Sequence, residues 1–202
     1  MANGRVCTGY SHPMAASYAA SAGTVTYTDP FIIARGVSVD ISLTTSSGTS
    51  FYADNSAQET SPGKFVSGTV TLTNDDPLPG IAKKIYGLPE EKTLSMSGST
   101  TVKYQGYGEQ ASYPYLGVGF IVRFQQDGAE SFVPVVLTKV RFSAPNTSRE
   151  TQGEEMSYQT TTLTGTIALD DGADKNWKFV FDEQTTEAAA VAVLEKFLGK
   201  AS

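Results

Sequence analysis

The chain has 202 residues, of which 40% are hydrophobic, and its formal net charge is -6. This length and composition indicate one globular domain over residues 1–202, and the single cysteine excludes an internal disulfide. Both halves of the chain carry more acidic than basic residues, which argues against a protein that grips nucleic acid through a basic patch. No apolar stretch reaches the length of a membrane span, and residues 1–20 lack the apolar core of a secretion signal, so we expect synthesis in the cytoplasm.

The first third of the chain favours strands over helices. Residues 1–35 are rich in Ala, Ser, Gly and Tyr without a clear period, which predicts an extended N-terminal arm with one short strand over 24–28. Apolar and polar residues alternate over 36–45, which predicts a half-buried strand. Residues 44–63 predict a long, polar, protruding loop, since structureless segments of this length are usually functional.

The middle third predicts one strand and one short helix. Alternation over 64–73 indicates another strand, and the spacing of apolar residues after it indicates a short helix that ends at Gly87. Asn74 or Asp75 is the expected N-cap of this helix. Residues 89–113 show no clear pattern, apart from a short stretch around Val102 that favours a strand.

The last third predicts further strands and a C-terminal helix. Strands are expected over 114–124, 131–145, the second half of 148–167, and 177–181. A shift in apolar phase around Pro134 predicts a bulge or an edge position there. Thr186 is the expected N-cap of a helix over 186–198. We therefore predict a mainly β fold, an antiparallel sandwich or barrel of two sheets, with one short helix and a flanking C-terminal helix.

Residues that could carry catalysis are few. His12 is the only histidine, and its neighbour Ser11 would point away from it on an extended strand, so a Ser-His device is not indicated. Glu150, Glu154 and Glu155 crowd one turn, whereas paired catalytic carboxylates face each other across a cleft. A partner carboxylate from elsewhere in the chain stays an open alternative. We expect no enzyme and no catalytic residues.

Metal and cofactor motifs are equally weak. Structural zinc needs several Cys and His ligands, which this chain lacks. The pairs Asp75-Asp76 and Asp170-Asp171 lack calcium-loop spacing and precede turns, where Asp is common. No dinucleotide or phosphate-loop fingerprint is present. We expect no metal and no cofactor.

Several motifs, in order along the chain, resemble one known family. They are "TGYSHPMAASY" (8–18), "YTDPFIIARGVSVDISL" (27–43), "GKFVSGTVTLTNDD" (63–76), "IAKKIYGL" (81–88), "PYLGVGFIVRF" (114–124), "VVLTKVRFSAP" (135–145) and "ETQGEEMSYQTTTLTGTI" (150–167). Over nearly its whole length, the chain resembles the major tail proteins, or tail tube subunits, of bacteriophages with long non-contractile tails. Residues 89–113 and 174–182 match least well.

This resemblance implies a structural virion protein that forms stacked, hexameric rings and so a hollow conduit for the genome. The implied partners are other copies of the chain, a tape-measure protein and a tail terminator, with DNA passing through without tight binding. The implied contacts with the adjacent ring lie in the loop 44–63, and the candidates are Phe51, Tyr52, Asp54, Glu59 and Lys64. The candidates in the N-terminal arm are Tyr10, His12 and Tyr18, and Asp40 is the candidate for the lumen.

A second hypothesis is a monomeric β-sandwich that binds carbohydrate or acts as an adhesin. It depends on a cluster of tyrosines, since aromatic rings can stack on sugars. The cluster consists of Tyr104, Tyr107, Tyr113 and Tyr115. Packing of these rings in the core or at a subunit interface is the preferred interpretation.

Overall fold

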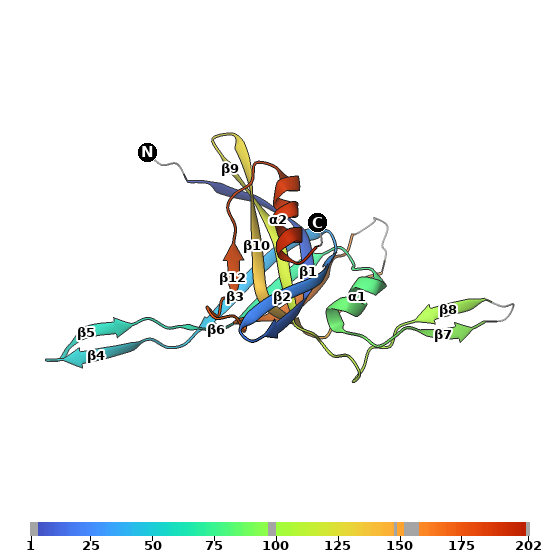
Figure 1. The fold of residues 1–202 in the computed structure, drawn as a ribbon, viewed down its shortest axis with the longest axis horizontal. Coiled ribbons are helices and arrows are strands. Elements are labelled where there is room, and N and C mark those ends of the chain that lie inside the picture. Colours follow the sequence, from blue (N-terminus) through green and yellow to red (C-terminus); the bar gives the residue numbers. More distant parts are fainter. Residues whose placement is uncertain (1–3, 97–99, 148, 152–157, 201–202) are drawn as a thin grey trace.

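The computed structural model describes residues 4–96, 100–147, 149–151 and 158–200. A body built on one antiparallel sheet carries two helices, and two hairpins project from it (Figure 1). The body strands are β1 (Val6–Ser21), β2 (Thr24–Ile32), β3 (Gly36–Thr45), β6 (Phe65–Asn74), β9 (Leu116–Gln126), β10 (Ala129–Phe142), β11 (Thr161–Ala168) and β12 (Lys178–Val180). The hairpins pair β4 (Thr49–Ala53) with β5 (Ser56–Ser61), and β7 (Lys92–Ser95) with β8 (Thr101–Tyr104). The helices are α1 (Pro79–Tyr86) and α2 (Glu187–Phe197).

The body strands follow the order β2-β1-β9-β10-β11-β6-β3, and β12 pairs with β10. This arrangement confirms the predicted mainly β, antiparallel class with a short helix and a C-terminal helix. The ladder is continuous and wraps around the core, whereas the prediction divided the strands between two sheets. The curvature brings β1, the strand next to the end strand β2, close to the other end strand: the ring of Tyr10 in β1 lies directly over Gly36 in β3.

Sequence alternation explains which faces the strands bury. In β11, Leu163 and Ile167 point into the core, and the threonines between them are exposed. Strand β9 instead buries consecutive residues from Leu116 to Ile121. It does so because α2 covers its outer face: Leu194 of α2 and Leu198, the residue that caps its C-terminus, pack with Ile121 there. The middle of the sheet is therefore covered on both sides.

The N-terminal segment differs from the prediction. Residues 6–32 form the long hairpin β1–β2 inside the sheet, so the expected arm over 1–35 with one short strand is wrong. The turn at Ala22 and Gly23 has positive φ angles at both positions, which suits a tight hairpin. Met14, Ala15 and Ala16 are buried between β9 and β2. Because β1 consists largely of small residues, its sequence shows no clear alternation of apolar and polar side chains.

Both helices end where the sequence indicated, but only α2 begins with the predicted N-cap residue. Thr186 caps α2 by accepting the Ala189 N–H at 3.2 Å, which confirms the predicted helix. Gly87 ends α1 in the left-handed conformation, also as predicted. No side chain caps the start of α1, and the expectation of an Asn74 or Asp75 cap is wrong. Asn74 is buried at the end of β6, and Asp75 accepts the Arg35 N–H and pairs with its guanidinium.

The segment predicted as a protruding loop over 44–63 does protrude, but as the ordered hairpin β4–β5. The hairpin β7–β8 lies in the region without a sequence pattern and projects from the opposite side of the body (Figure 1). The two hairpins mark the ends of the long axis of the molecule.

Candidate assembly surfaces

The base of the β4–β5 hairpin is held by backbone contacts. Ser46 N–H donates to the Lys64 carbonyl at 2.8 Å, and Lys64 N–H donates to Ser46 Oγ at 2.9 Å. A Cβ at Gly63 would lie 1.9 Å from the Ser46 carbonyl oxygen, so the close approach requires glycine there. At the tip, Asp54 and Asn55 have φ angles of 50° and 58°, which both residue types tolerate. Local chemistry therefore sets both the direction and the register of the hairpin.

The side chains of this hairpin include large apolar groups in solvent. Phe51 is 64% exposed and Tyr52 is 68% exposed. Asp54 and Glu59 are exposed on the same hairpin, whereas Lys64 lies at its base. The structure thus places four of the five candidate inter-ring residues on the projecting part. A two-stranded hairpin on its own is marginally stable in water, so this hairpin would gain stability from a partner. Exposed aromatic rings are typical of a surface that contacts such a partner.

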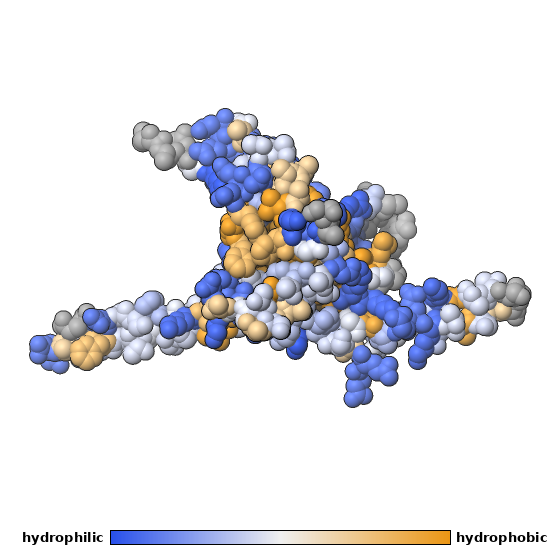
Figure 2. Space-filling view, in the orientation of Figure 1, coloured by the Kyte–Doolittle hydropathy of each residue, from blue (hydrophilic) through white to orange (hydrophobic). Residues whose placement is uncertain are grey.

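The sequence indicated only part of the second hairpin, β7–β8: the strand expected around Val102 is β8, whereas β7 was not predicted. Leu94, Val102 and Tyr104 are each about half exposed on it. Leu94 is the one apolar residue of β7, so the sequence shows no alternation there. Apolar (orange) atoms are visible on both hairpins, among polar ones (Figure 2).

The N-terminal candidates do not belong to a free arm. The Tyr10 ring packs edge-on against Phe120 with centroids 5.6 Å apart, and burial raises the pKa of its hydroxyl. His12 sits at a bulge in β1, and its Nδ1 lies 3.3 Å from Glu187 Oε1 in α2. Tyr18 donates to Asp171 Oδ2 at 2.8 Å and accepts the Asp171 N–H at 2.9 Å. All three side chains engage the body of their own chain, which corrects the arm expectation.

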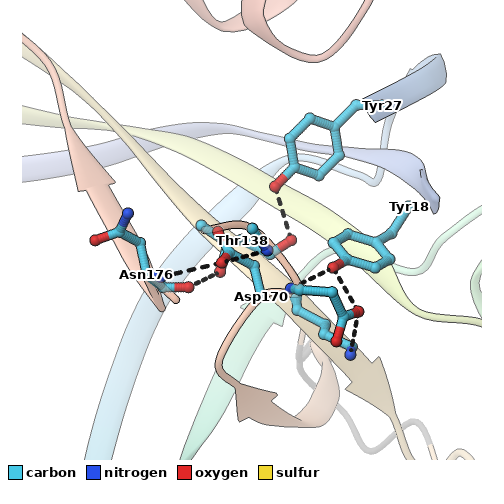
Figure 3. A network of polar contacts seen from close by, with 8 residues as sticks. Tyr18, Tyr27, Thr138, Asp170 and Asn176 are labelled. Carbon is cyan, nitrogen blue, oxygen red and sulfur yellow. Dashed lines mark hydrogen bonds and ion pairs between the residues drawn. The ribbon is translucent and has the colours of Figure 1, made fainter. Parts of the chain in front are cut away.

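The turn over 170–176 is tied to the sheet by a polar network (Figure 3). Tyr27 donates to the Thr138 carbonyl at 2.9 Å, and Thr138 Oγ1 donates to the Asn176 carbonyl at 2.7 Å. The buried Asp170 accepts the backbone N–H groups of Gly172 and Asn176. Its carboxylate therefore organises the turn. Within the described ranges, no group of three or more His, Cys, Asp or Glu residues could hold a metal ion.

The candidate lumen residue Asp40 lies on a hydroxyl-rich face. It pairs across the ladder with Thr71 of β6, which in turn pairs with Thr164 of β11. The outward side chains of these three strands are Ser38, Asp40, Ser42, Thr69, Thr71, Thr73, Thr162, Thr164 and Thr166. Among these described residues, Asp40 alone carries a charge. The face is polar and weakly acidic at these positions, and Arg141 of β10 lies across from Thr166 at its border.

Both ends of the sheet leave a strand edge open. The ladder stops at β2 on one side and at β3 on the other, and no described strand pairs with their outer edges. Val37 and Leu43 on β3, and Ile32 on β2, expose a large part of their side chains. An open edge with exposed apolar residues is a template for pairing with another chain.

The four candidate sugar-binding tyrosines lie in three places. Tyr107 and Tyr113 flank Tyr86 edge-on and line a cavity of about 710 Å³ with it. Tyr115 lies under the Arg141 guanidinium at 3.9 Å, and Tyr104 is on the β7–β8 hairpin. Sequence reasoning missed Tyr86, which the helix α1 brings to the cavity.

The polar side of this cavity is satisfied internally. Arg149 Nη2 lies 3.2 Å from Asp76 Oδ1, and Thr161 Oγ1 donates to the same oxygen at 2.7 Å. Of the acidic cluster, Glu150 is exposed, and its N–H donates to Gln159 Oε1 at 3.1 Å. Glu154 and Glu155 lie outside the described residues.

No protein-family model matches this chain, and no curated protein sequence matches it either. In the part of the chain that the structure describes, neither helix is long and apolar enough to cross a membrane.

Proposed function

We propose that this chain is a structural virion protein, the subunit of a bacteriophage tail tube that polymerises as stacked, hexameric rings. One observation carries the proposal: the ordered β4–β5 hairpin projects from the body and exposes Phe51 and Tyr52 at its end. Such a hairpin gains most of its stabilising contacts from a neighbour. The sequence motifs that resemble tail tube subunits indicate that this neighbour is another copy of the same chain.

Two further features support assembly into rings. The open edges of β2 and β3 allow the sheets of adjacent subunits to join, which removes both edges when a ring closes. The hydroxyl-rich face around Asp40 suits the lumen, because the hydroxyl and carboxylate side chains of β3, β6 and β11 do not hold passing DNA phosphates. The proposed partners are other copies, a tape-measure protein and a tail terminator, and the proposed location is the virion.

Negative-stain electron microscopy of the purified chain tests the proposal. We expect rings or tubes at high concentration, alone or together with the tail proteins of the same phage. Monomers that persist in every such mixture, without rings or tubes, contradict it.

A small-ligand or carbohydrate-binding role is the second candidate, favoured by the cavity lined by Tyr86, Tyr107 and Tyr113. Its volume lies in the range of small-molecule sites. Saturable binding by a stable monomer, measured by calorimetry after a glycan or fragment screen, supports this role. A Tyr107→Ala variant with unchanged binding would contradict it.

A further inference from the structure

The two hairpins carry opposite charges at opposite ends of the molecule. Residues 49–61, the β4–β5 hairpin, contain Asp54 and Glu59 and no basic residue. Residues 92–104, the β7–β8 hairpin, contain Lys92 and Lys103 and no acidic residue. They project from opposite sides of the body (Figure 1). Within the described residues, each hairpin is a two-stranded sheet of its own that projects from the body (Figure 1).

One face of the β7–β8 hairpin is apolar with a lysine beside it. Leu94 lies directly across from Val102, and Lys92 lies directly across from Tyr104. Residues two apart on a strand share a face, so these four side chains form one surface, which we call the lysine face. Leu94 is 55% exposed and Val102 is 49% exposed. Lys103 points to the other face, where its Nζ lies 3.5 Å from Glu91.

The β4–β5 hairpin has a surface that combines an apolar side chain with a negative charge. Phe51 lies directly across from Glu59, so a largely exposed aromatic ring and a carboxylate share one surface, the glutamate face. Among the described residues, neither Glu59 nor Lys92 has an ion-pair partner. Each face thus combines exposed apolar area with one uncompensated charge, and the two charges are opposite.

We propose that the lysine face of one chain binds the glutamate face of a second copy of the same chain. Phe51 packs on the pair Leu94 and Val102, and the Glu59 carboxylate meets the Lys92 ammonium. The contact removes apolar surface from water, and opposite charges set the register and exclude pairing of like hairpins. This inference rests on the proposed assembly function and names the partner of its projecting hairpin.

A contact between opposite ends of identical chains repeats from copy to copy, as a closed ring or an open row. Each single contact is small, so it is weak between two free chains. Many such contacts formed together in a ring or stack hold firmly, because every contact after the first is intramolecular. The ionic part of the contact weakens with added salt.

Charge reversal with mixing tests this pairing in the full chain. We expect Glu59→Lys alone, and Lys92→Glu alone, each to weaken self-association on the order of tenfold in sedimentation velocity. An equimolar mixture of the two variants recovers association, because the new positive charge on one chain faces the new negative charge on the other. Lys103→Glu makes the same charge change on the opposite face of β7–β8 and is the matched control, expected to sediment as wild type.

The outcomes separate the pairing from the function. Single variants that associate as wild type, or a mixture no stronger than either variant alone, overturn the pairing. If such variants still form tubes in negative stain, the proposed function is retained and only the proposed hairpin contact is rejected. Wild-type chains that remain monomeric to about 1 mM and form no tubes count against both. Circular dichroism and thermal unfolding verify that each variant keeps the wild-type fold, as exposed positions allow.

Discussion

The strands β9 and β10 and the two hairpins follow the same β rules but end in opposite situations. Ile121 and Val136 lie in the middle of the sheet and are fully buried, because α2 covers one face and the core covers the other. Phe51 and Leu94 lie on hairpins with no second layer and stay more than half exposed. The difference teaches that a ladder and a tight turn define the shape of a strand pair, whereas a covering layer supplies its stability.

Deleting residues 46–62 should have the largest effect, because it removes the β4–β5 hairpin and leaves the body intact. Thr45 pairs with Phe65, so the deletion would join β3 to β6 through the two residues Gly63 and Lys64. A two-residue loop with glycine first suits a tight hairpin turn. We expect wild-type circular dichroism and a cooperative thermal transition, with complete loss of tubes in negative stain. Long tubes from this variant would contradict the role of the hairpin.

Truncating one apolar side chain in each region gives the next largest contrast. Leu194 of α2 is fully buried against the sheet, so Leu194→Ala should lower the free energy of unfolding by about 2–5 kcal/mol. Phe51→Ala on the hairpin should change it by less than about 0.5 kcal/mol. Urea denaturation measures both. A large loss of stability in Phe51→Ala would mean that the hairpin supports the body.

Removing a cap from the body should have a smaller effect. Thr186 accepts the Ala189 N–H at the start of α2, so Thr186→Ala should cost about 1 kcal/mol in urea denaturation. The hairpin control is Ser50→Ala, which removes an exposed hydroxyl contact with Thr60. Equal losses in the two variants would erase the distinction between body and hairpin.

The smallest expected effect depends on pH. The Ser11 hydroxyl, helped by His12 and Arg123, holds the pKa of Glu187 below its usual 4.5. A lowered folded-state pKa stabilises the fold above the unfolded value, and this contribution is lost as the pH falls through the folded value. Glu187→Gln should therefore lower stability at neutral pH by less than about 1 kcal/mol and match wild type in acid.

Chemical denaturation of wild type and Glu187→Gln across the pH range checks this sign. The exposed Glu130 of β10 provides the control, because Glu130→Gln should leave the profile unchanged. A difference that grows toward acid pH would contradict the stated role of Glu187.

Patterns that are local in the chain could be predicted from the sequence. The strand in the second half of 148–167, the helix capped by Thr186 and the stop at Gly87 all appear in the structure as expected. Each depends on residues within a few positions of one another. The projection of residues 44–63 was also predictable, because a long polar stretch rarely enters a core.

Features that depend on distant partners could not be predicted. The bulge expected at Pro134 is wrong: Pro134 pairs in register with Ile121, and the shift falls between Leu137 and Val140. There Thr138 donates its N–H to the Trp177 carbonyl, a partner far along the chain. The position of Tyr86 in the cavity likewise depends on distant residues, because the sequence pattern predicted the helix α1 but not where it packs.

The sequence by itself determined the class of the fold, its helix ends and the acidic balance of the chain, since propensity, capping and charge act locally. Only the tertiary structure decided that residues 6–32 enter the sheet, because the small side chains of β1 are buried there by partners on β9 and β2 that lie elsewhere in the chain. It alone also decided that the hairpins lie at opposite ends with complementary faces. Burial on β1 and exposure on the hairpins both depend on whether a second layer is present, and that layer comes from residues far away in the chain.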